Sequence, residues 1–167
     1  MTTDCIIALM DHSGRQLKWL SRACKKLSMI VDISKMSSVY LDEFENDKSD
    51  SKNETSLVMA LSIKSRLSCE DLLKNVVKIE GEIRLEATRD VIDILILAYG
   101  EELKMTPGLT IPHPRLHSHP QLLYPAAEIM GQFVHPVLKR SLKELAGLTG
   151  LKWGRYFEQG SRVLDFS

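Results

Sequence analysis

Hydrophobic and polar positions along the chain form patterns that predict four strands and three helices. Strands are predicted where short apolar or alternating runs occur, at residues 5–10, 29–40, 57–63 and 90–98. Helices are predicted where apolar residues recur every three or four positions, from residue 15 onward, from residue 69 onward and over residues 138–148. Ser68 and Asp71 match a capping box at the start of the second helix.

The order of these elements indicates an α+β fold of the ferredoxin-like kind. Its βαββαβ arrangement packs helices on an antiparallel sheet, and in this chain a C-terminal helical extension follows. We expect residues 1–167 to form a single domain, because this length suffices for one hydrophobic core. The fold alone does not define a function.

Two segments interrupt the regular pattern. Residues 42–54, reading DEFENDKSDSKNE, are acidic and polar, so we expect a mobile loop that buries little apolar surface. Residues 109–125, reading LTIPHPRLHSHPQLLYP, contain four prolines, which we expect to exclude a long helix or a central strand.

The composition argues against several classes of protein. Lys plus Arg number 22 and Asp plus Glu number 22, so charge gives no reason to expect nucleic acid or an anionic membrane as the partner. Neither a signal-peptide pattern nor an apolar run of membrane-spanning length is present. Cys5, Cys24 and Cys69 lie far apart and are expected to be small core residues rather than metal ligands or disulfides. We therefore expect a cytoplasmic protein.

Several short motifs, in matching order, resemble those of the hydroxymethyldihydropterin pyrophosphokinases of folate synthesis. The sequence SSVY at 37–40 closes the second predicted strand, and Tyr99-Gly100 ends the most apolar one. The most specific motif is LTIPHPRLH at 109–117, followed by PAAEI at 125–129 and by His135-Pro136. Family members are similar there, with LTVPHPRLH, a short arm, P-L-x-E-I and a later His-Pro.

The resemblance covers roughly residues 4–145 and implies transfer of a pyrophosphoryl group from ATP to the hydroxymethyl group of a dihydropterin. It also implies two Mg²⁺ ions held by an Asp-x-Asp pair on the central strand, whose residues i and i+2 share one face. Here Asp93 matches the first aspartate and Leu95 replaces the second. Asp90 would face the opposite side unless a bulge intervened, so we expect it to be solvated.

The resemblance also assigns residues to the phosphates and the nucleotide. Family members have a longer loop that closes over ATP, whereas this chain has only residues 81–89, with Arg84 and Arg89 as its cations. Their roles as phosphate partners or as solvated arginines stay open. Three further residues match the nucleotide side of the family's site: Glu80, Thr110 and His113.

The pterin side departs further from the family pattern. Met10-Asp11-His12 stands where relatives have a Gly-Ser-Asn turn, and Val58 replaces an asparagine that reads the pterin edge. Gln121 replaces the stacking aromatic ring and His119 replaces an arginine. At roughly 1–3 kcal/mol per lost contact, pterin binding should weaken by several kcal/mol. With one carboxylate and the lid also missing, we expect impaired or lost activity.

Two alternatives to catalysis remain at this point. The first is a nucleotide-binding or protein-interaction module that keeps the fold without its chemistry. The second is a metal site formed by His113, His117 and His119, because three histidines within seven residues could ligate zinc.

Overall fold

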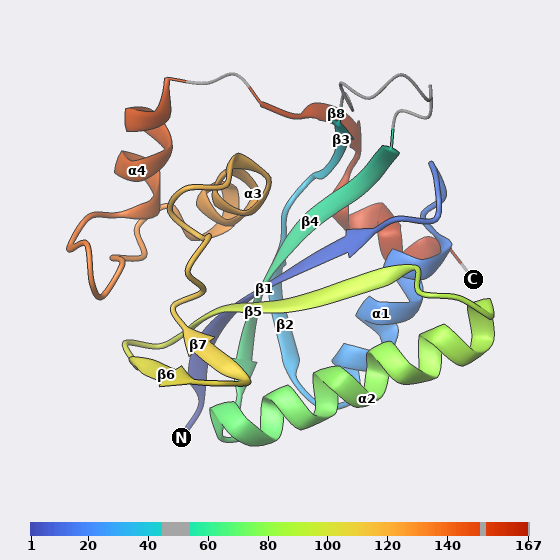
Figure 1. The fold of residues 1–167 in the computed structure, drawn as a ribbon, viewed down its shortest axis with the longest axis horizontal. Helices are drawn as coiled ribbons and strands as arrows, with labels where there is room; N and C mark the ends of the chain where they lie inside the picture. Colours follow the sequence, from blue (N-terminus) through green and yellow to red (C-terminus); the bar gives the residue numbers. More distant parts are fainter. Residues whose placement is uncertain (45–53, 151–152, 167) are drawn as a thin grey trace.

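The main sheet of the protein is built entirely from antiparallel pairs. The structure is a computed structural model that describes residues 1–44, 54–150 and 153–166 (Figure 1). The strands follow the order β5-β1-β4-β3-β8, and β2 pairs with β4 beside β3. They are β1 (Thr3–Asp11), β2 (Asp32–Met36), β3 (Val39–Phe44), β4 (Glu54–Ser65), β5 (Ile92–Tyr99) and β8 (Arg155–Glu158). A hairpin of β6 (Lys104–Thr106) and β7 (Leu109–Ile111) lies next to β5.

Helices cover both faces of this sheet. They are α1 (Lys18–Ser28), α2 (Cys69–Ala87), α3 (Pro120–Met130) and α4 (Leu142–Thr149), with a 3₁₀ turn η1 (Gly160–Asp165) against α1. Figure 1 shows α1 and α2 on one side and α3 and α4 on the other, and we call these sides the α2 face and the α3 face. The arrangement confirms the predicted ferredoxin-like α+β fold with a helical extension.

A hydrophobic core lies on each face of the sheet. In β1, Cys5, Ile7 and Leu9 are buried on the α2 face, whereas Ile6 and Ala8 are buried on the α3 face. Because successive side chains point to opposite faces, a strand covered on both sides needs apolar residues at every position. This explains the continuous apolar runs of β1 and β5.

The strand predicted at residues 29–40 differs from the observed structure in two ways. Residue Met29 caps α1 and is 83% exposed, so the strand begins only at Asp32. The strand is also interrupted at Ser37, which separates β2 from β3. The Ser37 hydroxyl accepts a hydrogen bond from the Ala60 N–H at 2.8 Å, so a side chain takes the place of a ladder carbonyl.

We expected the four prolines to exclude a long helix or a central strand from residues 109–125, and the second half of this segment begins α3, a helix of 11 residues. Pro120 occupies the start of α3, where its missing N–H would have no helical partner in any case. Pro125 lies inside the helix and removes one hydrogen bond, but it is buried together with Leu122, Leu123 and Ala126. Tertiary packing on the α3 face therefore outweighs the local penalty.

The predicted bounds of the 42–54 loop and of the 138–148 helix also differ from the structure. Asp42–Phe44 belong to β3 and Glu54 belongs to β4, so the ends of the predicted 42–54 loop were wrong, and residues 45–53 lie outside the described residues. Helix α4 begins at Leu142 rather than Leu138, with the Ser141 hydroxyl capping it by accepting from the Glu144 N–H.

We predict that Leu61→Ala lowers the free energy of unfolding by about 2–5 kcal/mol, because Leu61 is fully buried in the core on the α2 face. The matched control is Leu85→Ala on α2, where the leucine is 81% exposed and the change should stay within about 0.5 kcal/mol. Urea denaturation measures both. Equal effects of the two substitutions would contradict the assignment of this core.

Candidate active site on the α3 face

A row of three polar side chains crosses the sheet where β5 begins and β1 ends. Asp93 lies on β5, His12 directly follows β1 and Ser56 lies on β4. His12 Nε2 is 2.8 Å from Asp93 Oδ2, and His12 Nδ1 is 2.8 Å from Ser56 Oγ. The Asp93 and His12 side chains are 56% and 40% exposed, so solutes can reach them.

Strand periodicity places Asp93 on the α3 face. Ile92 and Ile94 belong to the core on the α2 face, whereas Leu95 packs against the core on the α3 face. Asp93 and Leu95 therefore project to the same side, as residues i and i+2 of a strand do. The hydrogen bond with His12 holds the pKa of Asp93 below its usual range, which favours an ionised carboxylate at this surface.

The segment expected to serve as a short loop over ATP is largely helical. Helix α2 continues to Ala87, so Arg84 lies in its last turn and not on a loop. Its guanidinium forms an ion pair with Asp90, which precedes β5 and is 82% exposed. Arg89 is exposed in the connection that follows the helix, and its charge acts on the Asp11 carboxylate. This connection is shorter than the sequence pattern suggested.

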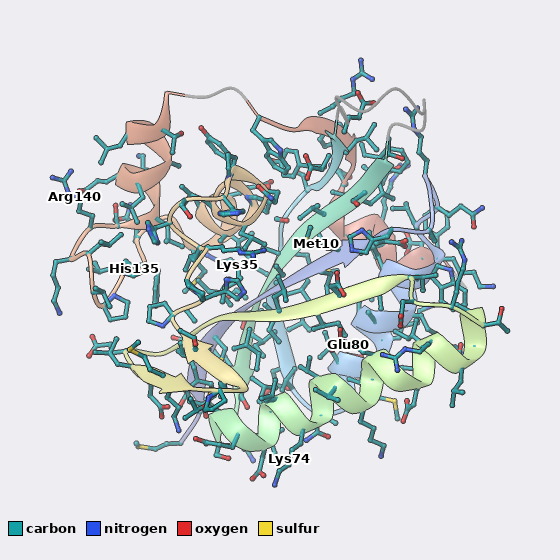
Figure 2. All side chains as sticks on the ribbon, viewed as in Figure 1. Met10, Lys35, Lys74, Glu80, His135 and Arg140 are labelled. Atoms are coloured by element: carbon teal, nitrogen blue, oxygen red, sulfur yellow. The ribbon has the colours of Figure 1, made fainter. Side chains whose placement is uncertain are left out.

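Glu80 lies on α2 and contacts β5 from the α2 face, opposite to Asp93. Figure 2 shows it between α2 and β5, and its carboxylate accepts a hydrogen bond from the Ile94 N–H at 3.3 Å. That N–H belongs to the edge of β5 that does not pair with β1. Burial raises the pKa of Glu80, and the nearby negative charge of Asp93 adds to this effect.

Thr110 and His113 line a cavity of about 270 Å³ next to β5, which Ile94 and Leu95 also line. The His113 backbone N–H donates to Leu97 O at 2.8 Å, which anchors this arm to β5. The His113 Nδ1 accepts a hydrogen bond from the Arg115 N–H at 3.1 Å, and burial lowers the pKa of the ring. A neutral ring with Nδ1 as acceptor carries its proton on Nε2, which can donate to a phosphate oxygen.

Two of the sequence motifs meet in a cluster that sequence reasoning did not anticipate. Glu128, from the PAAEI motif, accepts hydrogen bonds from the Ser38 N–H and hydroxyl and from the Tyr40 hydroxyl, all from the SSVY motif. Burial and the Glu128 carboxylate raise the pKa of Tyr40 to about 12. The cluster ties α3 to the break between β2 and β3, and the motif residues themselves were the signal.

A buried carboxylate on β3 is the other feature that the sequence did not reveal. Asp42 is 5% exposed, and its Oδ1 accepts from Trp153 Nε1 at 3.0 Å. The Trp153 ring stacks on Tyr124 and is tilted against Tyr40. Among the described residues, Asp42 Oδ2 is buried without a hydrogen-bond partner, and burial raises the pKa of this residue. Asp42 is the register partner of Ser56, so it continues the polar row onto β3.

The three-histidine metal site was a wrong alternative. In the part of the chain that the structure describes, no three His, Cys, Asp or Glu side chains come together to hold a metal ion. His117 instead packs edge-on against His135, and His119 Nδ1 lies 3.0 Å from the Ser118 hydroxyl. Across the same described ranges, no helix is long and apolar enough to cross a membrane.

A family model and individual relatives of known name all point to the same protein family. Residues 6–131 match the family described as 7,8-dihydro-6-hydroxymethylpterin-pyrophosphokinase (HPPK). Two of the proteins that are similar to this chain are each named 2-amino-4-hydroxy-6-hydroxymethyldihydropteridine pyrophosphokinase. The Aquifex aeolicus protein is 31% identical over 153 residues, which cover 87% of this chain and 92% of the relative. The Bacillus subtilis protein is 32% identical over 141 residues, covering 79% and 81%.

Solved structures agree at the level of the fold. A Plasmodium falciparum HPPK-DHPS A437G chain matches with a TM-score of 0.73 at 13% identity, covering 89% of this chain and 46% of that one. The chain thus spans less than half the length of these Plasmodium proteins. It has the same fold as the part of them that it matches. With the family match and the Aquifex relative, it follows that the chain belongs to the HPPK family.

The site does not match a two-carboxylate magnesium centre. Leu95 leaves Asp93 as a single carboxylate on this part of β5, and the group beside it is the imidazole of His12. A mixed nitrogen and oxygen pair suits a transition-metal ion better than Mg²⁺, which favours oxygen ligands.

We predict that Asp42→Asn is more stable than the wild-type protein at about pH 7.5 and that the difference disappears toward about pH 3. The raised pKa of Asp42 means that ionising it opposes folding, so wild-type stability is lost as pH rises through that pKa. Urea denaturation at both pH values measures this difference, and Asp4→Asn on an exposed residue is the control. A variant that is less stable at both pH values would contradict the argument.

Proposed function

We propose that this protein binds ATP and 6-hydroxymethyl-7,8-dihydropterin on the α3 face. It transfers the pyrophosphoryl group of ATP to the hydroxymethyl oxygen of the pterin, at an impaired rate. The hydroxymethyl oxygen attacks the β-phosphorus of ATP, the bond from that phosphorus to the α-phosphate oxygen breaks, and AMP leaves. The hydroxyl proton goes to solvent. The observation that carries the proposal is the exposed carboxylate of Asp93, on the same face as Leu95, with a pKa that the hydrogen bond with His12 lowers.

The nucleotide would lie along the edge of β5. Thr110 and His113 line the same cavity, and Glu80 reaches the neighbouring backbone. The His113 Nε2–H can donate to a phosphate oxygen while its other nitrogen stays fixed by the Arg115 N–H. Arg89, exposed just before β5, would add a positive charge near the phosphates. Arg84 can do so only by leaving its ion pair with Asp90.

The pterin would lie over β1 and β4, against the polar row. Ser56 offers a hydroxyl there, whereas Val58 is fully buried and offers no polar group. Binding of the pterin edge is therefore weaker than in a site with an asparagine at that position.

The impairment has a physical cause in the cation site and the missing cover. When bound, Mg²⁺ would offset the negative charge that moves between phosphate oxygens during transfer. With one carboxylate in place of two, and with α2 joined to β5 by only a few residues, we expect a loss on the order of a thousandfold relative to complete relatives.

A second candidate is a binding module that uses another part of the surface. A cavity of about 740 Å³ lies along β2 and η1, where Lys35, Glu128 and Gly160 line it. A ligand held there would not need Asp93. Nucleotide binding that is unaffected by substitution of Asp93 would favour this candidate.

We further propose that residues 1–167 act as one domain in the cytoplasm. The three cysteines are buried and unpaired, and burial raises the pKa of Cys5 and Cys24 to about 12, so these thiols stay protonated. Free thiols agree with a reducing compartment.

We predict that Asp93→Asn lowers turnover by about a hundredfold or more, because it removes the charge that would hold a cation at the phosphates. AMP release with ATP, Mg²⁺ and the hydroxymethyl pterin measures the rate. Asp4→Asn, at the opposite end of β1, should leave it within about twofold. If Asp93→Asn turns over like the wild-type protein, the proposed role of Asp93 is wrong.

We also predict that Leu95→Asp raises turnover with Mg²⁺ by about tenfold or more, because it restores a second carboxylate on the face of Asp93. Leu95→Asn has the same shape without the charge and should give no increase. Both variants lose apolar packing, so thermal unfolding is recorded to confirm that each is folded at the assay temperature. No gain from Leu95→Asp would show that the missing carboxylate does not limit the reaction.

A further inference from the structure

The contact between His12 and Asp93 goes beyond the family pattern. We propose that His12 is the second protein ligand of the nucleotide-bound cation, in the place that Leu95 leaves empty, and that the site therefore prefers Mn²⁺ to Mg²⁺. This inference rests on the proposed function, because it concerns the same phosphate-bound cation. It assigns a role to a residue in the turn after β1, where the resemblance predicted only a lost Gly-Ser-Asn turn.

The two atoms already lie at a separation that one cation can bridge. His12 Nε2 and Asp93 Oδ2 are 2.8 Å apart. Two ligands bound at right angles, each about 2.1 Å from a metal ion, are about 3 Å apart. A shift of a few tenths of an ångström would therefore open the pair enough for a cation to replace the shared proton. Both side chains are partly exposed, so a phosphate-bound cation can approach.

The second ring nitrogen of His12 also has a hydrogen-bond partner, as in most metal-bound histidines. His12 Nδ1 is 2.8 Å from Ser56 Oγ, which fixes the orientation of the ring. In the hydrogen-bonded pair, Nε2–H donates to the carboxylate, because an ionised carboxylate can only accept. With a cation bound, the proton sits on Nδ1 and donates to Ser56, and Nε2 presents its lone pair. The ring stays neutral, and the Ser56 hydroxyl changes from donor to acceptor.

The two carboxylates nearest in sequence, Asp11 and Asp90, are engaged elsewhere. Asp11 precedes His12 in sequence, but it is fully buried and its Oδ1 accepts from the N–H and hydroxyl of Ser13. It continues the Cys5, Ile7, Leu9 series and so faces the α2 side. Asp90 is paired with Arg84. His12 and Asp93 would thus supply two ligands, and phosphate oxygens and water would supply the rest, as is usual for nucleotide-bound cations.

The choice of metal follows from the chemistry of imidazole. Imidazole nitrogen suits first-row transition-metal ions better than Mg²⁺, which keeps oxygen ligands and water, and Mn²⁺ is the ion of that series that also accepts carboxylate, phosphate and water oxygens. We expect Mn²⁺ to bind the protein–nucleotide complex at least about tenfold more tightly than Mg²⁺ does, beyond the difference that the nucleotide alone shows.

The test is pulsed electron paramagnetic resonance of Mn²⁺ in a complex with α,β-methylene-ATP. This analogue cannot be cleaved between its α- and β-phosphates, where the reaction breaks ATP. Protein is prepared with ¹⁴N-histidine and with ¹⁵N-histidine. A coupling that changes with the histidine isotope in the wild-type protein, and that is absent from His12→Asn, supports the proposal. His117→Asn, on the arm before α3, is the matched control and should keep the coupling.

Isothermal titration of Mn²⁺ and Mg²⁺ into the same complexes separates the possible failures. We expect His12→Asn to weaken Mn²⁺ binding by about tenfold and Mg²⁺ binding by less than about threefold. If Mn²⁺ binds in an Asp93-dependent way without any histidine coupling, the role of His12 is wrong and the proposed function stands. If neither metal binds with the nucleotide in the wild-type protein, both proposals fail.

Discussion

The antiparallel register of β5, β1 and β4 is the constraint on which the candidate site depends. It sets Met10 opposite Asp93 on one side and opposite Val58 on the other. Since the side-chain period of a strand is two, a slip of one residue would turn Asp93 toward the α2 face and remove it from the site. Apolar residues on both faces of β1 resist such a slip, because it would move every buried side chain of the strand. The core therefore positions the chemistry.

Charge at the site follows from this packing. Asp93 is partly exposed, and its bond with His12 favours the ionised form, whereas Asp42 is buried and its pKa is raised. The two carboxylates lie on β5 and β3, at opposite ends of the β5-β1-β4-β3 order, and their pKa values are shifted in opposite directions. The exposed one suits a cation, and the buried one is held by Trp153 within an aromatic cluster that also contacts Tyr40.

Much of the fold was predictable because local patterns and global structure agree. Continuous apolar runs predicted the central strands, and Ser68 caps α2 as its sequence indicated. The shared face of Asp93 and Leu95 followed from strand period alone. His12 was not predictable as a partner of Asp93, because 81 residues separate them and only the strand register brings them together. The break at Ser37 likewise depends on a side-chain bond to a distant strand, which no local pattern encodes.

The location of bound nucleotide tests this account most directly. Crystals grown with α,β-methylene-ATP, the hydroxymethyl pterin and Mn²⁺ would show it, since the anomalous signal of manganese marks the phosphates. We predict a triphosphate on the α3 face above Asp93, with a phosphate oxygen at His113 Nε2 and the base toward Thr110. A nucleotide bound on the α2 face, or in the cavity along β2 and η1, would contradict the account.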